Sequence, residues 1–375
     1  MSAHSSGAVL SLRALNRATL DRQMLLRGAD CSVLDAVHHL YGLQAQAPLP
    51  PYFALWARLR RFQPDDLAQL ILDRQVLRMV MMRGTVHLTT GHDGLALRAL
   101  TQPIMDGDLR TNTTFAPLLR DIDLKSLATR AREILATRTT TDAELGKLLA
   151  ETWPDHEPRA LAHAARNLLP LVQVPPRAIW GKSGQPTYAT AESWLGERPP
   201  TQPSVDNMVL RYLAAYGPAT VKDAQAWSGL TKLAEVLERL RPQLRPLRDE
   251  QGRELFDLPD APRPDPDVSA PVRFLAPFDN ILLSHADRTR IISDEHRKRI
   301  ISFNGLVKGT ILVAGFARGS WEITRKRGTA TLSIAPFAKL SKKDITALVG
   351  AGARLLAFAE SDADTHDVQF STAST

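Results

Sequence analysis

The sequence of 375 residues has a single cysteine, Cys31, and no long apolar run. One cysteine excludes an internal disulfide framework and a zinc site built from several thiolates. This pattern fits a reducing compartment, and we interpret Cys31 as a small buried apolar side chain. No segment has the length of a membrane span, and the stretch 1–9 lacks the basic start and apolar core of a signal peptide. These absences predict a cytoplasmic protein without a membrane partner.

Lysine is missing from the first 124 residues, because the first lysine of the chain is Lys125. Schiff-base enzymes commonly use a lysine amine, so a Schiff-base mechanism lacks support from the N-terminal third of the chain. The chain also lacks the Gly-x-Ser-x-Gly nucleophile motif. His38 and His39 lie near Asp35, but no further carboxylate or cysteine completes the spacing of a metal site. We expect neither a metal nor another cofactor.

Positive charge is in modest excess, with 47 Lys and Arg against 40 Asp and Glu and a sequence pI near 9.7. The excess is concentrated, since residues 286–330 hold ten Lys or Arg and four Asp or Glu, a net charge of +6. Such a segment favours an anionic partner, although a small excess is also common on solvated surfaces.

A pattern of short helices followed by a β-hairpin occurs three times, in a chain long enough for two or three domains. The expected helices are near 16–27, 32–41, 52–60 and 64–73, then 124–136, 142 onward and 157–169, then 206–216, 221–227 and 231 onward. The expected hairpin strands are 76–82 with 85–89, 171–174 with 186–189, and 244–247 with 254–258. This is the order of a winged helix-turn-helix. We predict a mainly α fold with β-hairpins (α+β), as tandem winged helix-turn-helix repeats around one concave, C-shaped basic face.

The expected domains are 10–122, 123–203 and 204–360, with flexible tails at 1–9 and 361–375. Pro and Asp crowd residues 259–271, which predicts an ordered linker without regular structure. The third domain would add a C-terminal β-element, with strands near 272–276, 279–284, 310–316, 320–326 and 329–335 and a last helix over 341–359.

Gln44-Ala45-Gln46 lies where a helix-like apolar run ends and a Pro-rich turn begins. Two glutamines at i and i+2 on an extended or turning backbone project to the same side, so their amides form one polar surface. Neutral amides can hold a water or a base edge without being acids or bases. By residue type alone, a structural role in the turn is the simpler interpretation.

Several segments, in order along the chain, together resemble a known family. They are Leu15-Asn16-Arg17-Ala18-Thr19-Leu20 through Gln44-Ala45-Gln46-Ala47-Pro48, Met82-Arg83-Gly84-Thr85-Val86-His87-Leu88, Tyr216-Gly217-Pro218-Ala219-Thr220 with Trp227-Ser228-Gly229-Leu230, and Phe278-Asp279-Asn280-Ile281-Leu282-Leu283-Ser284-His285-Ala286-Asp287-Arg288. Over roughly residues 10–360 the sequence resembles the AlkZ/YcaQ-type winged-helix DNA glycosylases. In that family a Gln-apolar-Gln motif is the proposed catalytic element of the AlkZ branch, whereas the YcaQ branch tends to carry Gln-apolar-Asp. Gln46 therefore places this chain nearer the AlkZ branch.

The resemblance implies a monofunctional DNA glycosylase that excises N7-alkylated purines, including bulky adducts or interstrand crosslinks, from double-stranded DNA. N7-alkylation leaves a cationic base that departs readily, so no strong general acid is needed. Gln44 and Gln46 would then orient the water that attacks C1′. The biological role would be DNA repair or self-resistance to a DNA-alkylating natural product. We expect a nucleoid-associated monomer in the cytoplasm.

Candidate DNA contacts lie at three places in the chain: Arg83 and His87 beside the first hairpin, His285, Arg288 and Arg290 in the basic region, and Lys326 and Arg327 at a predicted hairpin tip. A basic tip can contact phosphates or enter a groove. Ordinary surface turns and ion pairs explain the same residues. Near the motif, Tyr41, Tyr52, Phe53 and Trp56 could stack on a base, although core packing is commoner.

Two other classes of protein remain open. A non-catalytic winged-helix DNA-binding protein, such as a transcriptional regulator, would release no base and would tolerate changes at Gln44 and Gln46. An architectural or protein-interaction module would bind DNA weakly, with a shallow dependence on salt. Release of base from alkylated DNA distinguishes the enzyme from both.

Overall fold

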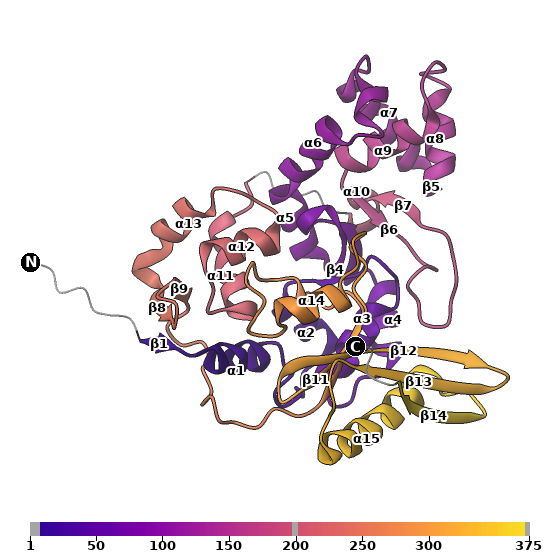
Figure 1. Cartoon of the computed structure of the whole chain (residues 1–375). Coiled ribbons are helices and arrows are strands. Elements are labelled where there is room, and N and C mark those ends of the chain that lie inside the picture. The colour runs from indigo at the N-terminus through magenta and orange to yellow at the C-terminus, as the bar shows by residue number, and fades with distance from the viewer. Residues whose placement is uncertain (1–7, 197–201, 372–375) are drawn as a thin grey trace, which may run out of the picture.

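The computed structural model describes residues 8–196 and 202–371, which form a mixed α/β fold (Figure 1). One order of elements occurs three times: a helix, a short strand or bridge, two helices and a hairpin. The first unit has α2 (Val33–Leu40), β2 (Leu43–Gln44), α3 (Pro50–Arg58), α4 (Pro64–Leu72), β3 (Val76–Val80) and β4 (Val86–Thr90). The second has α7 (Leu124–Thr137), β5 (Thr140–Thr141), α8 (Asp142–Ala150), α9 (Pro158–Leu168), β6 (Leu171–Gln173) and β7 (Thr187–Thr190). The third has α11 (Val205–Tyr216), a bridge at Ala219, α12 (Val221–Ser228), α13 (Leu233–Leu240), β8 (Arg245–Asp249) and β9 (Glu254–Asp257).

Local sequence explains where these helices begin and which face they bury. Thr141 and Thr220 each start a helix with a reciprocal capping box, which satisfies two backbone N–H groups that the helix leaves unpaired. In α13 the buried residues follow the helical repeat, at Leu233, Val236, Leu237 and Leu240. This helix begins two residues later than the sequence predicted, because Lys232 in front of it adopts a left-handed conformation.

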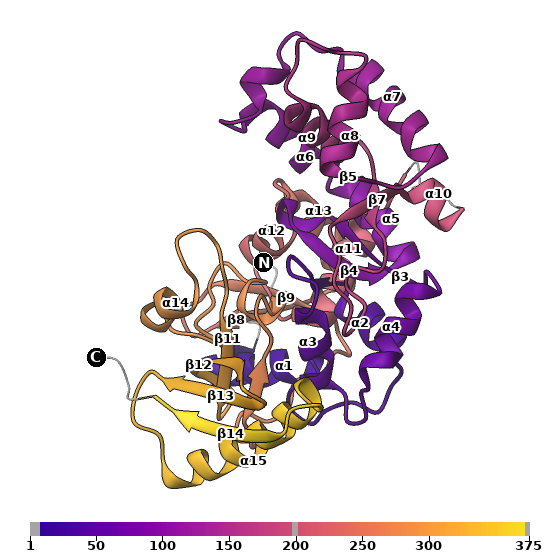
Figure 2. The same cartoon turned by 90° about the vertical axis from the view of Figure 1, so that its right-hand side faces the viewer.

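The hairpins of the first two units are not separate wings. They join in one six-stranded sheet of order β2-β4-β3-β6-β7-β5, in which Arg78 of β3 pairs with Gln173 of β6. Figure 2 shows this joint between the arm of α7, α8 and α9 and the remainder of the molecule. The third hairpin forms another sheet with β1 (Val9–Leu10), which pairs in parallel with β8. The first two units are therefore braced together through backbone hydrogen bonds.

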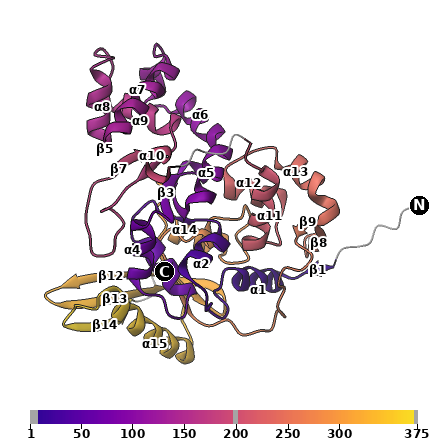
Figure 3. The same ribbon diagram turned by 180° about the vertical axis from the view of Figure 1, so that it is seen from behind.

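The C-terminal segment has its own five-stranded sheet, of order β10-β11-β12-β13-β14, and α15 (Lys342–Ala359) packs on it (Figure 3). Its strands are β10 (Arg273–Leu275), β11 (Gly309–Val313), β12 (Phe316–Lys326), β13 (Thr329–Pro336) and β14 (Thr365–Phe370). The linker over 259–271 contains no helix or strand, as predicted.

Two predictions in this segment were wrong. The expected strand at 279–284 is instead a 3₁₀ helix, Asn280–Leu282. The Asp279 carboxylate caps this helix by accepting the Ile281 N–H at 3.1 Å. The same carboxylate accepts two hydrogen bonds from the buried Arg58 guanidinium, each at 2.8 Å, which holds Asp279 in place. The expected flexible tail forms β14, which pairs in parallel with β13. The last residues, 372–375, and the first, 1–7, lie outside the described part of the chain.

Some elements were not predicted from the sequence, and others differ from their prediction. The additional helices are α5 (Gly91–Leu100), α6 (Gln102–Thr111), α10 (Ala191–Leu195) and α14 (Asp294–Ile300), with 3₁₀ turns at Met82–Gly84, Ala116–Leu119 and Arg241–Gln243. The helix expected over 16–27 is α1 (Leu12–Arg22). Cys31 is exposed rather than buried. No helix among the described residues is long and apolar enough to span a bilayer.

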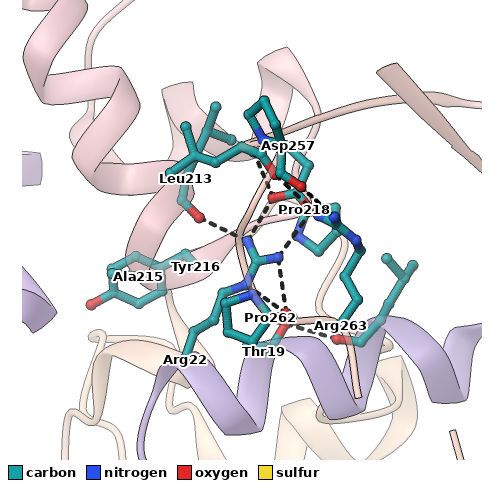
Figure 4. Close-up of polar contacts among 12 residues, drawn as sticks. Thr19, Arg22, Leu213, Ala215, Tyr216, Pro218, Asp257, Pro262 and Arg263 are labelled. Atoms are coloured by element: carbon teal, nitrogen blue, oxygen red, sulfur yellow. Dashed lines mark hydrogen bonds and ion pairs between the residues drawn. The ribbon is translucent and has the colours of Figure 1, made fainter. Parts of the chain in front are cut away.

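A buried ion pair fixes α1 against the third unit (Figure 4). The Arg22 guanidinium donates to both carboxylate oxygens of Asp257, at 2.7 and 2.9 Å, and to the Leu213 carbonyl at 3.0 Å. Arg263 also pairs with Asp257. Removing one partner would leave an uncompensated buried charge, which costs about 3–5 kcal/mol. This cluster therefore holds the third unit in a fixed place beside the first.

Candidate active site

Gln44 lies in β2, at the edge of the six-stranded sheet. After α2, Tyr41 and Gly42 take positive φ values of 55° and 109°, which turn the chain back toward the sheet. Gln44 then pairs with His87 of β4 in antiparallel register. Its side chain is buried, and its Oε1 accepts a hydrogen bond from Arg83 Nη2 at 2.9 Å. The first glutamine is therefore held by the turn between β3 and β4.

Gln46 is exposed and meets the same turn. Its Oε1 accepts the backbone N–H of Val86 at 3.1 Å, while the Ala45 N–H donates to the Val86 carbonyl at 2.8 Å. Both glutamine side chains thus contact the segment 83–86, in agreement with the common side that their spacing predicted.

These contacts fix the orientation of both carboxamides. Because each Oε1 faces an N–H donor, the amide nitrogen must occupy the other position. Within the described part of the chain, neither Nε2 has a hydrogen-bond partner. Each Oε1 also keeps a second lone pair. The pair can therefore offer both donors and acceptors to a water or a ligand.

Arg83 connects the motif to the third unit. It has φ 56° in the tight turn, and its guanidinium donates to the carbonyl of Trp227 as well as to Gln44. His87 Nδ1–H donates to the Thr85 carbonyl at 3.0 Å, so His87 Nε2, 3.3 Å from Arg83 Nη2, is the acceptor. Burial, and then the Arg83 charge, lower the pKa of His87 to about 3. Burial lowers the pKa of Arg83 to about 10, so at neutral pH the histidine is uncharged and the arginine charged.

Arg78 is a buried cation beneath the motif. It is 2% exposed, and its Nη2 donates to the carbonyl of Ala45 at 2.7 Å. Its Nε and Nη1 have no partner among the described residues. Burial, and then the charge of Arg177, lower its pKa to about 10. Sequence reasoning missed this residue, although a lone charge inside Val76-Leu77-Arg78-Met79-Val80 is an anomaly for a buried strand.

A cavity of about 460 Å³ opens beside Gln46. The first unit contributes Val80, Arg83 and Val86, and the opposite wall comes from α6, α9 and β7. The lining on that wall includes Ile104, Met105, Asp108, His163, Asn167 and Tyr188. A larger hollow of about 690 Å³, near Cys31 and Phe62, includes no motif residue. The cavity beside Gln46 is therefore the one relevant to the motif.

Three of the residues predicted to contact DNA have buried side chains that are already hydrogen-bonded within the protein. His87 and His285 are 0% and 1% exposed, and Arg290 is 4% exposed. The His285 ring bonds the Tyr216 carbonyl at 3.0 Å, and burial lowers its pKa to about 3. Arg290 donates to the Pro218 carbonyl at 2.7 Å. His285 and Arg290 therefore fasten the C-terminal segment to the third unit.

The side chains of the other predicted DNA contacts differ in their exposure to solvent. Arg83 points inward, as described above, and Arg288 is half-buried with its Nε on the His285 carbonyl. Lys326 and Arg327 are exposed at the tip between β12 and β13. Their neighbour Arg325 instead pairs with Glu360 and Asp362. Lys326 and Arg327 are thus the candidates that remain free for a nucleic-acid contact.

The aromatic residues near the motif belong to the core. Tyr41 stacks on Trp227, with ring centroids 5.8 Å apart. Tyr52, Phe53 and Trp56 pack in an aromatic cluster with Trp180 and Phe358. Among the described residues, no group of three His, Cys, Asp or Glu side chains is arranged to hold a metal ion.

Sequence reasoning also missed Phe303. Its side chain is fully exposed in the short loop that the Ile301–Val307 bridge closes. The signal was present, because Phe303 stands between Ser302 and Asn304-Gly305 in the basic region. An exposed aromatic side chain among basic residues is a surface suited to nucleic acid.

Comparison with known proteins places this chain in a class. The family model described as "DNA glycosylase AlkZ-like" matches residues 37–358, which include Gln44 and Gln46. The chain belongs to the AlkZ-like DNA glycosylase family. It is 24% identical over 351 residues to the interstrand DNA cross-link repair glycosylase of Streptomyces sahachiroi, covering 88% of this chain and 91% of that protein. The solved structure of the Streptomyces sahachiroi DNA glycosylase AlkZ has the same fold, with a TM-score of 0.82 at 21% identity over 97% of this chain and all of that one.

Proposed function

We propose that this DNA glycosylase is monofunctional and removes N7-alkylated, cationic purines, including bulky adducts and crosslinks, by water attack at C1′. The observation that carries the proposal is the pair of carboxamides at Gln44 and Gln46. Both are oriented by donors of the β3–β4 turn, both have unused hydrogen-bonding groups, and Gln46 lines a cavity. A water held between them could be aimed at an anomeric carbon without proton transfer to the protein.

Amides suit a substrate that is already activated. A cationic N7-alkylpurine leaves without strong acid help, so the protein needs only to place the water and support its attack. No lysine is among the described residues that line the cavity, which argues against a Schiff-base intermediate. The two carboxylates of the lining are paired with neighbours in the same lining, since Asp108 lies 2.7 Å from His163 Nε2 and Asp142 lies 2.7 Å from Arg166 Nη1.

The fold supports duplex DNA as the substrate. We propose that the thrice-repeated helix-and-hairpin units are winged helix-turn-helix repeats, with domain boundaries near residues 122 and 203. The exposed Lys326, Arg327 and Phe303 would contact the duplex from the C-terminal segment. We also propose a role in interstrand cross-link repair, which is the role stated in the name of the Streptomyces sahachiroi relative.

The test uses a duplex with a single N7-methylguanine. After incubation, alkali converts abasic sites into strand breaks, and the account predicts breaks only after alkali. Breaks without alkali, or trapping of the protein on DNA by borohydride, would show a lyase and contradict the monofunctional mechanism. Intact DNA after alkali would exclude the glycosylase activity on this substrate.

A further inference from the structure

We propose that the cavity beside Gln46 receives the alkylated guanine base itself, so that the damaged nucleotide leaves the stack during the reaction. This inference rests on the proposed function and adds a binding site for the base. One wall is the β3–β4 hairpin of the first unit, and the other is α9 of the second unit together with α6, a helix between the two units, whose hairpins share one sheet. A small-molecule site at a junction of this kind is common.

The size and the walls suit a planar heterocycle. The volume of about 460 Å³ falls within the range of small-ligand pockets, and it leaves room for a substituent on the base. Val80 and Val86 form an apolar wall next to Gln46, and Ile104 and Met105 form another on α6. Apolar side chains on both walls would cover the two faces of a ring, while polar atoms at the rim would form hydrogen bonds to its edge.

Asn167 supplies an oriented acceptor. Its Nδ2 donates to the Asp108 carboxylate at 3.2 Å and to the His163 carbonyl at 3.0 Å, which fixes the amide and leaves Oδ1 without a partner in the described part of the chain. Asn167 is 8% exposed and lines the cavity. Guanine carries N–H donors on its pairing edge next to the O6 acceptor, so an amide oxygen here can accept from N1–H or the N2 amine.

Tyr188 supplies the complementary donor. It is 4% exposed and lines the cavity, and among the described residues its hydroxyl has one hydrogen-bond partner, Gln173 Nε2, at a long 3.5 Å. In that contact the hydroxyl accepts, so its own hydrogen remains available for guanine O6. Gln173 Oε1 is buried without a partner in the described part of the chain, so this wall has unmet hydrogen-bonding capacity.

The arginines of the lining are held by hydrogen bonds: Arg83 donates to Gln44, Arg166 to Asp142, and Arg177 to the Gly184 carbonyl. Only the charge of Arg166 is paired with a carboxylate, and Arg177 Nε has no partner among the described residues. A backbone phosphate is therefore the rival occupant of this cavity. The free base 7-methylguanine carries no phosphate, so its binding distinguishes the two.

The experiment measures inhibition of excision by the free base 7-methylguanine, together with its binding to the whole protein by calorimetry. Val80→Phe places a ring in the cavity, and Asn167→Ala removes the acceptor. Each change should weaken inhibition by about tenfold or more, the effect of one lost oriented contact. Ala143→Phe is the matched control, because exposed Ala143 lines a neighbouring cavity of about 410 Å³ that does not include Gln46. Duplex binding and thermal unfolding identify any variant that is merely misfolded.

Three outcomes are distinguishable. Inhibition lost in both cavity variants and kept in Ala143→Phe supports the base site. If the parental protein excises the base and 7-methylguanine inhibits all variants equally, the base site is overturned. The proposed function then stays intact. Absence of both excision and 7-methylguanine binding in the parental protein overturns both proposals.

Discussion

Arg78 Nη2 lies 2.7 Å from the carbonyl oxygen of Ala45, the residue between the two glutamines. A buried guanidinium with two unpartnered nitrogens is costly to fold around. Its one bond holds the peptide that sets the direction of both carboxamides. We infer that Arg78 is a positioning residue, retained for the geometry of the motif rather than for stability.

Arg78→Met separates these two roles. The thioether fills similar space without charge, so the free energy of unfolding should stay the same or rise by about 1–4 kcal/mol. The excision rate constant should fall roughly 10- to 100-fold as the motif loses its anchor, with little change in duplex affinity. Arg78→Lys should restore part of the rate. A stable Met variant with the parental rate would contradict the positioning role. Arg61→Met, at an exposed site, should change neither property.

The rate of excision should be nearly independent of pH between about 4 and 9. The groups that contact Gln44 do not titrate in this range, because the pKa of His87 is lowered to about 3 and that of Arg83 to about 10. Gln44 and Gln46 do not titrate at all. Single-turnover rates on N7-methylguanine DNA measure this directly. A bell-shaped profile centred near neutral pH would instead indicate a general acid or base, with His163 and Asp108 as the first suspects.

Folding stability should depend on pH through His87. Its folded pKa of about 3 lies below the unfolded value of 6.5, so between these values the unfolded chain binds a proton that the folded protein excludes. The stabilisation is fully present above pH 6.5 and is lost as pH falls toward 3, with a slope of about 1.4 kcal/mol per pH unit. Urea unfolding at several pH values should show a shallower dependence in His87→Gln than in the parental protein. Equal slopes would mean that His87 is protonated in the folded state.

Much of the fold could be predicted from periodicity, capping residues and turn chemistry. The starts of the helices expected from 142 onward and from 231 onward were predicted to within two residues, because capping residues and an apolar stripe depend on neighbours within one turn of helix. The strand expected at 279–284 and the flexible tail were wrong, because Arg58 and β13 decide those conformations from far along the chain. A local sequence pattern does not show which distant residues will contact a segment.

The candidate site was predictable only in part. The spacing of Gln44 and Gln46 indicated their common side, yet nothing local showed that Arg83, Val86 and Arg78 hold them. His285 and Arg290 looked like DNA contacts because a sequence shows charge without burial. The wall formed by α6 and α9 lies beside Gln46 because β3 and β6 pair and join two hairpins in one sheet. The sequence pattern did not indicate this pairing.

The tip between β12 and β13 should account for part of the salt dependence of DNA binding. Lys326→Ala with Arg327→Ala removes two exposed charges, and the slope of log affinity against log salt should fall by roughly 2. Arg325→Ala is the matched control, because that guanidinium is paired with Glu360 and Asp362 and should contribute less. Titrations of a fluorescent duplex at several salt concentrations give the slopes. An unchanged slope in the double variant would show that this tip points away from DNA.

The central claim is that Gln44 and Gln46 together hold the attacking water. Gln46→Ala should lower the single-turnover rate on N7-methylguanine DNA by roughly 10²-fold or more, as loss of one preorganised polar group does. Adding Gln44→Ala should cost less than the sum of the single effects, since both side chains serve one water. Duplex affinity should survive, and Gln69→Ala, at an exposed glutamine of α4, should be unaffected. If the Gln44→Ala/Gln46→Ala protein releases N7-methylguanine at the parental rate, the motif is structural and this account of catalysis is wrong.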